Sequence, residues 1–340
     1  MNKFISIEGL FPSLFKYIPG WIRGTYYCIT GATGSGKSKF ARFAFAEWTY
    51  KYCIANAIPF KVIYFALEES YDFFWTTITL DKLKEATGIE LTYYQYKGYH
   101  EGMTEAIQIE IDKILPSIED MKKYIIVYDN VSNPTGLLET IKQEAGKHGK
   151  LIKGDTFMDE EGNEVSHKSF KYDDPNFHLV IVADHIGLCA TEQNKLGSVN
   201  TLHLAISKWS EYVVKLVCKR YNAIVVNVHQ QEMAGENNDN FKLGRLEPSE
   251  TKLGDNKLVG RDYMVTIGLF NPIKYGLRDY LKYNLSSFGD HFRVVHLLKH
   301  RNGIANIAKA MWFDGVGNKY EELPKPEDAA DLKKFLDGKK

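Results

Sequence analysis

One short segment constrains the fold of this chain more than any other. Residues 31–38 read GATGSGKS and satisfy the pattern G-x-x-x-x-G-K-[S/T]. A β-rich run, Thr25–Thr30, leads into the segment, and a helical pattern of aromatic and alanine residues follows over Lys39–Tyr52. A glycine-rich turn between a strand and a helix presents backbone N–H groups that wrap phosphates, and the helix N-terminus adds a favourable dipole. The segment therefore predicts a nucleotide-phosphate site made of Gly31, Ala32, Thr33, Gly34, Ser35, Gly36, Lys37 and Ser38.

Within this segment two side chains have a predicted chemistry of their own. Lys37 supplies a point charge for the phosphates, and the Ser38 hydroxyl can bind Mg²⁺.

The rest of the chain alternates predicted strands with predicted helices. The near-continuous apolar runs that predict strands are Lys61–Leu67, Tyr124–Asp129, His178–Asp184, Ala223–Val228 and Tyr263–Phe270. A second helix is expected over Tyr71–Ala86. Continuous rather than alternating apolar strands, interleaved with helices, are typical of a parallel sheet buried on both faces. The sequence thus predicts one α/β domain that fills most of the chain.

Composition narrows the class of protein. The 340 residues carry 43 basic and 43 acidic side chains, so attraction to nucleic acid requires a local basic patch. No apolar run approaches the roughly 18 residues of a membrane span, and the N-terminus lacks the pattern of a signal peptide. The four cysteines lie far apart without a C-x-x-C pair, which argues against a zinc site or a disulfide scaffold and favours a reducing cytoplasm.

Three segments are predicted to be loops or insertions outside the core. Gly149–Asn176 is polar and predicts an exposed β-hairpin with its turn at Glu161–Asn163. Gln231–Gly254 lacks periodicity and is expected to form a mobile loop. Pro324–Lys340 is a charged tail with an expected short helix at Glu327–Leu336.

The phosphate site needs an acidic partner at the end of a neighbouring strand to hold the Mg²⁺ shell. Asp129 and Asp184 both end predicted strands, and each could instead cap a turn. We favour Asp184, which is followed by the sequence HIGL.

Hydrolysis also needs a group that orients or deprotonates water. Glu68 and Glu69 end the strand that is expected beside the phosphate loop. Successive strand residues point to opposite faces, so only one of the two should face the nucleotide, and we favour Glu68. The alternative is an acidic pair that compensates the dipole of the next helix.

Five motifs in order resemble those of RecA-like ATPases, and in particular the motor domain of DnaB-type replicative helicases. They are GATGSGKS, FALEES, IVADHIGL, VVNVHQQ and KHRNG. The resemblance covers Ile18–Leu323 and implies a RecA-like P-loop NTPase core, an α/β fold with a mostly parallel central sheet flanked by helices. It also implies ATP and Mg²⁺ as ligands. Residues 1–17 would be a lead-in, 324–340 a charged C-terminal tail, and 149–176 a polar insertion outside the family pattern.

The resemblance also implies roles for individual residues. Lys37 and Ser38 would be the Walker A lysine and the Mg²⁺-binding hydroxyl, Asp184 the Walker B aspartate and Glu68 the catalytic glutamate. Gln230 would sense the γ-phosphate, a task that suits a neutral amide. Arg301 in KHRNG would act as a finger on the nucleotide of the adjacent subunit, assisted by Lys299, so that activity requires an oligomer.

Single-stranded DNA would pass through the centre of a ring, held by the loops Cys189–Asn200 and Gln231–Gly254. Their candidate cations for DNA phosphates are Lys195, Lys242, Arg245 and Lys252. The second loop also carries Glu236, Asp239, Glu247 and Glu250, as a plain solvated loop would.

The expected function is that of an ATP-dependent DNA helicase motor that hydrolyses ATP between subunits of a ring, expected to be a hexamer, and translocates on single-stranded DNA during replication. This function implies a loader or primase partner and no membrane contact. It also implies a cytoplasmic location, in a bacterial host if the chain is phage-encoded. The chain begins 30 residues before the loop, so we expect no separate N-terminal domain or linker helix, which fits a phage or mobile-element protein. The glutamate pair equally resembles the RadA and KaiC branch, so a recombination or repair ATPase that forms filaments or rings stays open, as does a DNA-independent assembly ATPase.

Overall fold

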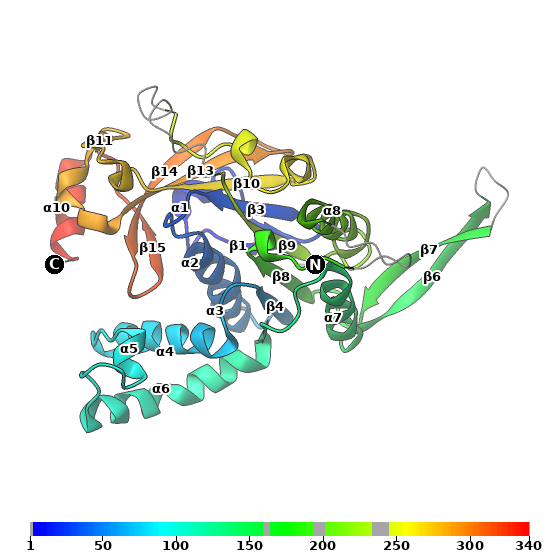
Figure 1. Cartoon of the computed structure of the whole chain (residues 1–340), viewed down its shortest axis with the longest axis horizontal. Coiled ribbons are helices and arrows are strands. Elements are labelled where there is room, and N and C mark those ends of the chain that lie inside the picture. Colours follow the sequence, from blue (N-terminus) through cyan, green and yellow to red (C-terminus); the bar gives the residue numbers. More distant parts are fainter. Residues whose placement is uncertain (1–2, 159–163, 193–200, 233–244, 340) are drawn as a thin grey trace.

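The computed structural model describes residues 3–158, 164–192, 201–232 and 245–339. A nine-stranded sheet forms its centre, with the strand order β15-β14-β13-β10-β3-β9-β8-β4-β5 (Figure 1). In that order the strands are Lys319–Glu322, Ile307–Asp314, Phe292–His300, Val265–Phe270, Tyr26–Gly31, Ile224–Gln230, His178–Asp184, Phe60–Ala66 and Ile125–Tyr128. The six strands from β10 to β5 pair in parallel, which confirms the predicted α/β fold with a mostly parallel sheet.

Helices cover both faces of the parallel strands. They are α1 (Pro12–Phe15), α2 (Lys37–Ala41), α3 (Trp48–Ala55), α4 (Tyr71–Thr87), α5 (Tyr93–Tyr96), α6 (Glu105–Tyr124), α7 (Pro134–Gly146), α8 (Leu202–Tyr212) and α10 (Ala329–Asp337). A π-helical stretch at Arg42–Glu47 joins α2 to α3, so the predicted helix Lys39–Tyr52 is continuous and slightly longer.

The alternation of side chains along β3 shows why continuous apolar strands suit this sheet. Tyr27 and Ile29 belong to the core that α2 and α3 complete, whereas Tyr26 and Cys28 belong to the core on the other face, under α7 and α8. Every residue of β3 is buried because successive side chains point to opposite faces and both faces are covered.

The sequence analysis did not identify the antiparallel part of the sheet. β13 pairs with β10, β14 with β13 and β15 with β14, all antiparallel. β13 buries Arg293 and His296 among its apolar residues, which interrupts the hydrophobic run that would have marked it as a strand.

Two parts project from the core at opposite ends of the molecule (Figure 1). α5 and the adjoining parts of α4 and α6 form one projection around a small apolar cluster of their own, and the antiparallel strands β6 (Gly149–Met158) and β7 (Glu164–Tyr172) form a long hairpin. The hairpin was predicted, but its predicted turn at residues 161–163 lies outside the described residues, as does most of the predicted mobile loop, residues 233–244. The predicted tail helix is α10.

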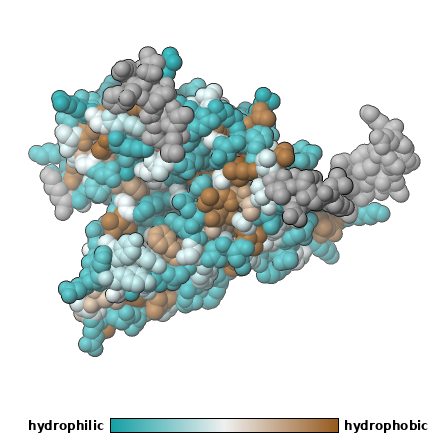
Figure 2. Space-filling model, viewed as in Figure 1, coloured by the Kyte–Doolittle hydropathy of each residue, from teal (hydrophilic) through white to brown (hydrophobic). Residues whose placement is uncertain are grey.

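Smaller elements complete the described chain. β1 (Phe4–Ser6) pairs with β2 (Gly20–Ile22), and β11 (Asp279–Tyr280) pairs with β12 (Tyr283–Asn284). The surface in Figure 2 is mostly hydrophilic, with apolar side chains in scattered patches. No helix in the described ranges combines the length and apolar character that crossing a bilayer requires.

Candidate nucleotide site

The loop Gly31–Ser38 joins the end of β3 to the start of α2, in the middle of the sheet. Gly36 begins the helix with φ 92°, a left-handed conformation that side chains disfavour. A Cβ at this position would lie 2.2 Å from the hydroxyl oxygen of Tyr320, which donates a hydrogen bond to the Gly36 carbonyl over 2.9 Å. Glycine at this position is therefore required both by the backbone and by a residue from the far end of the sheet.

Lys37 curls back over the loop that precedes it. Its Nζ donates to the carbonyl of Ala32 over 2.9 Å, and the residue is only 9% exposed. The ammonium group thus lies within the glycine-rich turn, where it could neutralise phosphate oxygens held by the backbone N–H groups.

Asp184, at the end of β8, lies directly beside Ser38. The Ser38 hydroxyl donates to Oδ1 of Asp184 over 2.9 Å, and the Tyr64 hydroxyl donates to Oδ2 over 2.6 Å. Burial raises the pKa of the Asp184 carboxyl above its ordinary value, while both hydrogen bonds lower it. A hydroxyl and a carboxylate at this separation are the hard oxygen groups that Mg²⁺ prefers, so the pair fits a Mg²⁺ ion that also binds phosphate.

Asp129, the alternative candidate, has a different position and contact. Its Oδ2 accepts a hydrogen bond of 2.7 Å from the backbone N–H of Tyr71, the first residue of α4. This is the capping contact that a strand-end aspartate commonly makes, and the structure brings Asp184 rather than Asp129 to the phosphate loop.

The two glutamates after β4 point in different directions. Oε2 of Glu68 lies 3.6 Å from Nε2 of His185, and the Glu68 side chain is 60% exposed. Glu69 turns toward the interior, where its Oε2 lies 3.9 Å from the guanidinium of Arg42. Burial raises the pKa of Glu69, although Arg42 opposes the shift. Of the pair, Glu68 is the carboxylate next to the residue that follows Asp184.

Thr33, at the tip of the loop, is held by two side chains from neighbouring strands. Gln230, the last residue of β9, donates from Nε2 to the Thr33 hydroxyl over 2.5 Å. Lys274, which follows β10, donates from Nζ to the Thr33 carbonyl over 3.1 Å. The predicted residue Gln230 is therefore in contact with the loop, and Lys274 is a second cation there that the sequence analysis missed.

Arg301 lies at the opposite end of the parallel strands, where β3 and β10 begin. Its backbone N–H donates to the carbonyl of Met264, whose own N–H donates to Tyr26 at the start of β3. The phosphate loop begins at the other end of β3, about 17 Å away at 3.3 Å per residue. The guanidinium of Arg301 donates to the carbonyl of Arg261, and the Nζ of Lys299 donates to that of Gly260. Neither side chain approaches the phosphate loop of the same chain.

Comparison with known proteins agrees with this arrangement. No protein-family model matches the sequence, and no curated protein matches it. Solved structures do match: an ATPase domain is 14% identical with a TM-score of 0.68, over 95% of this chain and 93% of that one. A DnaB-like replicative helicase, described with its interactions with primase, is 12% identical with a TM-score of 0.66, over 95% of this chain.

The chain has the fold of a DnaB-type helicase motor domain. A KaiC-like protein from Pyrococcus horikoshii shares the fold less closely, at 13% identity and a TM-score of 0.50, over 95% of this chain and all of that one. The resemblance inferred from the motifs is thus confirmed for the fold. This chain spans 63% of the length of the DnaB-like helicase.

Only some of the basic residues predicted to bind DNA lie within the described residues. Lys195 and Lys242 lie outside the described residues. Arg245 is exposed, whereas the Nζ of Lys252 donates to the carbonyls of Arg245 and Glu247, the latter over 2.9 Å. Lys252 therefore holds its own loop together in this structure.

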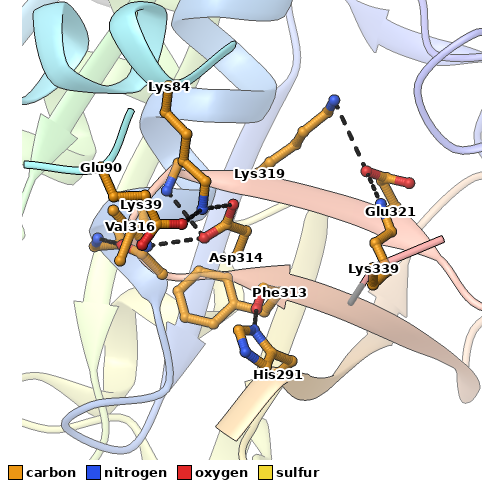
Figure 3. Close-up of polar contacts among 12 residues, drawn as sticks. Lys39, Lys84, Glu90, His291, Phe313, Asp314, Val316, Lys319, Glu321 and Lys339 are labelled. Atoms are coloured by element: carbon orange, nitrogen blue, oxygen red, sulfur yellow. Dashed lines mark hydrogen bonds and ion pairs between the residues drawn. The ribbon is translucent and has the colours of Figure 1, made fainter. Parts of the chain in front are cut away.

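The helix of the phosphate loop is also fastened to the C-terminal strands. Lys39 donates to the carbonyl of Gly315, and Lys84 on α4 lies 2.6 Å from both Asp314 and Glu90 (Figure 3). The turn between β14 and β15 thus contacts both α2 and α4. The turn thus links two helices that are distant from it in sequence.

Three further residues of this site were not predicted as site residues. His185, Lys274 and Tyr320 contact Glu68, Thr33 and Gly36, respectively. Only His185 adjoins a recognised motif residue. Among the described residues, no group of three or more His, Cys, Asp or Glu side chains is placed to hold a metal ion.

Proposed function

We propose that the chain is the motor of a DnaB-type helicase, which hydrolyses ATP between the subunits of a ring and moves along single-stranded DNA. The observation that supports this proposal is that two sets of residues lie at opposite ends of the parallel strands. Lys37, Ser38 and Asp184 lie together at one end, and Arg301 lies at the other. An arginine in that position has no access to its own nucleotide but could reach that of a neighbour.

Each residue has a chemical task in this proposal. The loop backbone and Lys37 bind the phosphates, and Mg²⁺ bound by Ser38, with Asp184 acting through water, neutralises charge on them. Glu68 orients or deprotonates the attacking water, and its exposed position leaves room for that water. Arg301 of the neighbouring subunit, assisted by Lys299, stabilises the charge that develops on the γ-phosphoryl group.

Gln230 provides a link between the nucleotide and the DNA-binding loops. It contacts Thr33 of the phosphate loop and immediately precedes the segment Gln231–Gly254. A change in its hydrogen bonding on hydrolysis would therefore be passed to that segment. Loader and primase partners of the ring belong to the same proposal.

A recombination or repair ATPase of the RadA type is the second candidate. The glutamate pair, in which Glu69 lies beside the buried Arg42, resembles that branch. The likeness to a KaiC-like protein also favours this candidate. Such a protein would act on single-stranded DNA without processive unwinding. Electron microscopy on DNA separates the two candidates, because closed rings are expected for the helicase and open filaments for a recombinase.

The first test is steady-state ATP hydrolysis with and without single-stranded DNA at low salt, with Lys37→Ala as the blank. Strong stimulation by DNA, followed by unwinding of a forked duplex, is the expected result. Hydrolysis that ignores DNA would contradict the helicase and favour an ATPase that switches the assembly of proteins.

A further inference from the structure

The β6–β7 hairpin leaves the core as an arm with a fixed base. Both of its strands have a free edge, since β6 and β7 pair only with each other in the described residues. At its base the Tyr172 hydroxyl donates to the carbonyl of Tyr221 over 2.7 Å, and the Phe170 and Tyr221 rings lie 4.9 Å apart. The direction of the arm is therefore set by the core.

The base of the arm exposes three lysines. Lys150 and Lys171 lie directly opposite one another in the register, and Lys153 is paired in the same way with Lys168. Like charges in cross-strand pairs destabilise a hairpin. Lys150, Lys153 and Lys171 are exposed, and within the described residues none of them has a carboxylate at ion-pair distance.

The same short stretch exposes two aliphatic side chains. Leu151 is 50% exposed and Ile152 is 37% exposed. Ile152 shares its face of the hairpin with Lys150 and Lys171, whereas Leu151 points to the other face. An acidic surface with apolar contacts would satisfy Ile152 and the two lysines together. We call Lys150–Lys153 and Lys171 the basic arm.

A surface of that kind exists at the far end of the molecule, on α5 and α6. Tyr94 and Tyr99 are 57% and 71% exposed, and Ile109 is 51% exposed. Glu101 and Glu105 are exposed nearby in sequence and form no ion pair with a described residue. We call these five residues the acidic tip.

The helix α6 explains why the tip faces outward. Ile107 and Ile111 pack against α4, so the inner side of α6 is already used. Glu105 and Ile109 are one turn apart and lie together on another face. Glu105 and Ile109 thus place a carboxylate beside a large exposed apolar side chain on α6, close in sequence to the other residues of the acidic tip.

The positions of the two surfaces suit a head-to-tail assembly. The basic arm and the acidic tip lie at opposite ends of the chain (Figure 1). The arm emerges beside Arg220, whose carbonyl accepts from Phe170 just before β9 begins, at the edge of the sheet that also holds Arg301. Complementary patches at different places on one chain generate heterologous contacts, which close into rings or continue as filaments.

We propose that the basic arm of one copy docks onto the acidic tip of the next copy, as a clamp between adjacent subunits. The inference rests on the proposed ring of motor subunits and names a contact that holds it together. Lys150 and Lys171 would pair with Glu101 and Glu105 of the next copy, and Ile152, on the same face of the hairpin, would cover Tyr99 or Ile109. A nucleic-acid surface is the alternative, and the test below distinguishes it.

The test compares charge-reversal variants by mass photometry, with Mg²⁺ and a non-hydrolysable ATP analogue present. Lys150→Glu with Lys171→Glu, and separately Glu101→Lys with Glu105→Lys, should each raise the dissociation constant of the assembly by about tenfold or more. All four changes in one chain should restore assembly. Lys51→Glu with Lys215→Glu, which reverses two exposed lysines elsewhere on the surface, is the matched control and should assemble normally.

A cross-linking experiment gives a readout that does not depend on the strength of assembly. All four natural cysteines are buried, so new surface cysteines react without competition. Ile152→Cys protein mixed with Tyr99→Cys protein should yield a cross-linked pair that neither protein forms alone. Unchanged assembly in both charge variants, together with no cross-link, would overturn the proposal. Weaker DNA binding with unchanged assembly would overturn it in favour of a nucleic-acid surface.

The failure of the two proposals can be told apart. If DNA fails to stimulate hydrolysis but the cross-link forms, the clamp stands and the helicase does not. If hydrolysis and unwinding are normal while the cross-link and the charge effects are absent, the helicase stands and the clamp does not.

Discussion

The hydroxyl of Ser38 donates a hydrogen bond to the carboxylate of Asp184 over 2.9 Å, although 146 positions separate the two residues. The contact exists because β8 lies two strands from β3, with β9 between them, and both strands end at the same edge of the sheet. In a parallel sheet, side chains at the carboxyl ends of strands from distant parts of the chain are brought together. This pair is where we expect Mg²⁺ to join the protein to the nucleotide.

Asp184→Asn should slow ATP hydrolysis or raise the Mg²⁺ concentration that it requires. An amide at this position keeps the shape of the side chain but loses the charge that orders the metal's ligands, so we expect a loss of about 10- to 100-fold in activity or apparent Mg²⁺ affinity. A Mg²⁺ titration of the hydrolysis rate measures the effect. Asp129→Asn is the matched strand-end control and should behave like the wild type.

Glu68→Gln should abolish turnover without preventing nucleotide binding. A positioned general base contributes about 10²- to 10⁴-fold, and Glu68 is the exposed member of the pair. Single-turnover hydrolysis and equilibrium binding of a fluorescent ATP analogue separate the two effects. Glu69→Gln, whose side chain faces Arg42, should reduce the rate far less. Equal losses of activity in the two variants would contradict the assignment of Glu68 as the general base.

Arg301→Ala should be inactive alone and partly active when mixed with Lys37→Ala. Mixed assemblies contain some interfaces in which an intact phosphate loop meets an intact arginine, because the two residues lie at opposite ends of the parallel strands. Hydrolysis is measured across a range of mixing ratios at constant total protein. No recovery at any ratio would exclude an arginine that acts on a neighbour.

The parts of the fold that could be predicted are those with a local pattern. The run Thr25–Thr30 and the glycine segment after it indicate a strand, a turn and a helix, and β3, the loop and α2 follow that order. α6 also had a readable signal that was missed. Its buried residues Ile111, Ile118 and Met121 recur at helical spacing.

The remaining contacts of the site depend on tertiary structure that no local pattern encodes. Tyr320 reaches Gly36 because β15 and β14 extend the sheet past β13, and charged residues shorten or interrupt the apolar runs of these antiparallel strands. Lys274 reaches Thr33 because β10 is the immediate neighbour of β3. Sequence motifs predict which residues carry the chemistry, whereas strand order determines which distant residues contact them.

Gly36→Ala should destabilise the protein through its contact with Tyr320 and not only through its backbone. The new Cβ would lie 2.2 Å from the Tyr320 hydroxyl oxygen, so we expect a loss of about 1–3 kcal/mol in the free energy of unfolding. Urea denaturation without nucleotide measures it. Gly34→Ala is the matched control, because Gly34 also has a positive φ but nothing within 4 Å of the added atom. Tyr320→Phe should recover part of the loss in the Gly36 variant and none in the Gly34 variant.

Asp81 on α4 should make stability fall as the pH rises. Burial raises the pKa of its carboxyl to about 8, although Arg42 at 4.0 Å opposes the shift, and neither oxygen has a hydrogen-bond partner in the described structure. The folded protein therefore keeps a proton that the unfolded chain releases above its ordinary pKa of about 4.

The stability that this proton contributes is complete below pH 4 and is lost as the pH rises toward 8, at up to about 1.4 kcal/mol per pH unit. Asp81→Asn carries no such proton, so the free energy of unfolding of the wild type minus that of the variant should decrease steadily from pH 5 to pH 8. Denaturation curves at four pH values measure this difference. Asp112→Asn, on the exposed side of α6, is the control whose difference from the wild type should stay constant over the same range. A constant difference for Asp81→Asn would mean that Arg42 keeps the carboxylate charged in the folded protein.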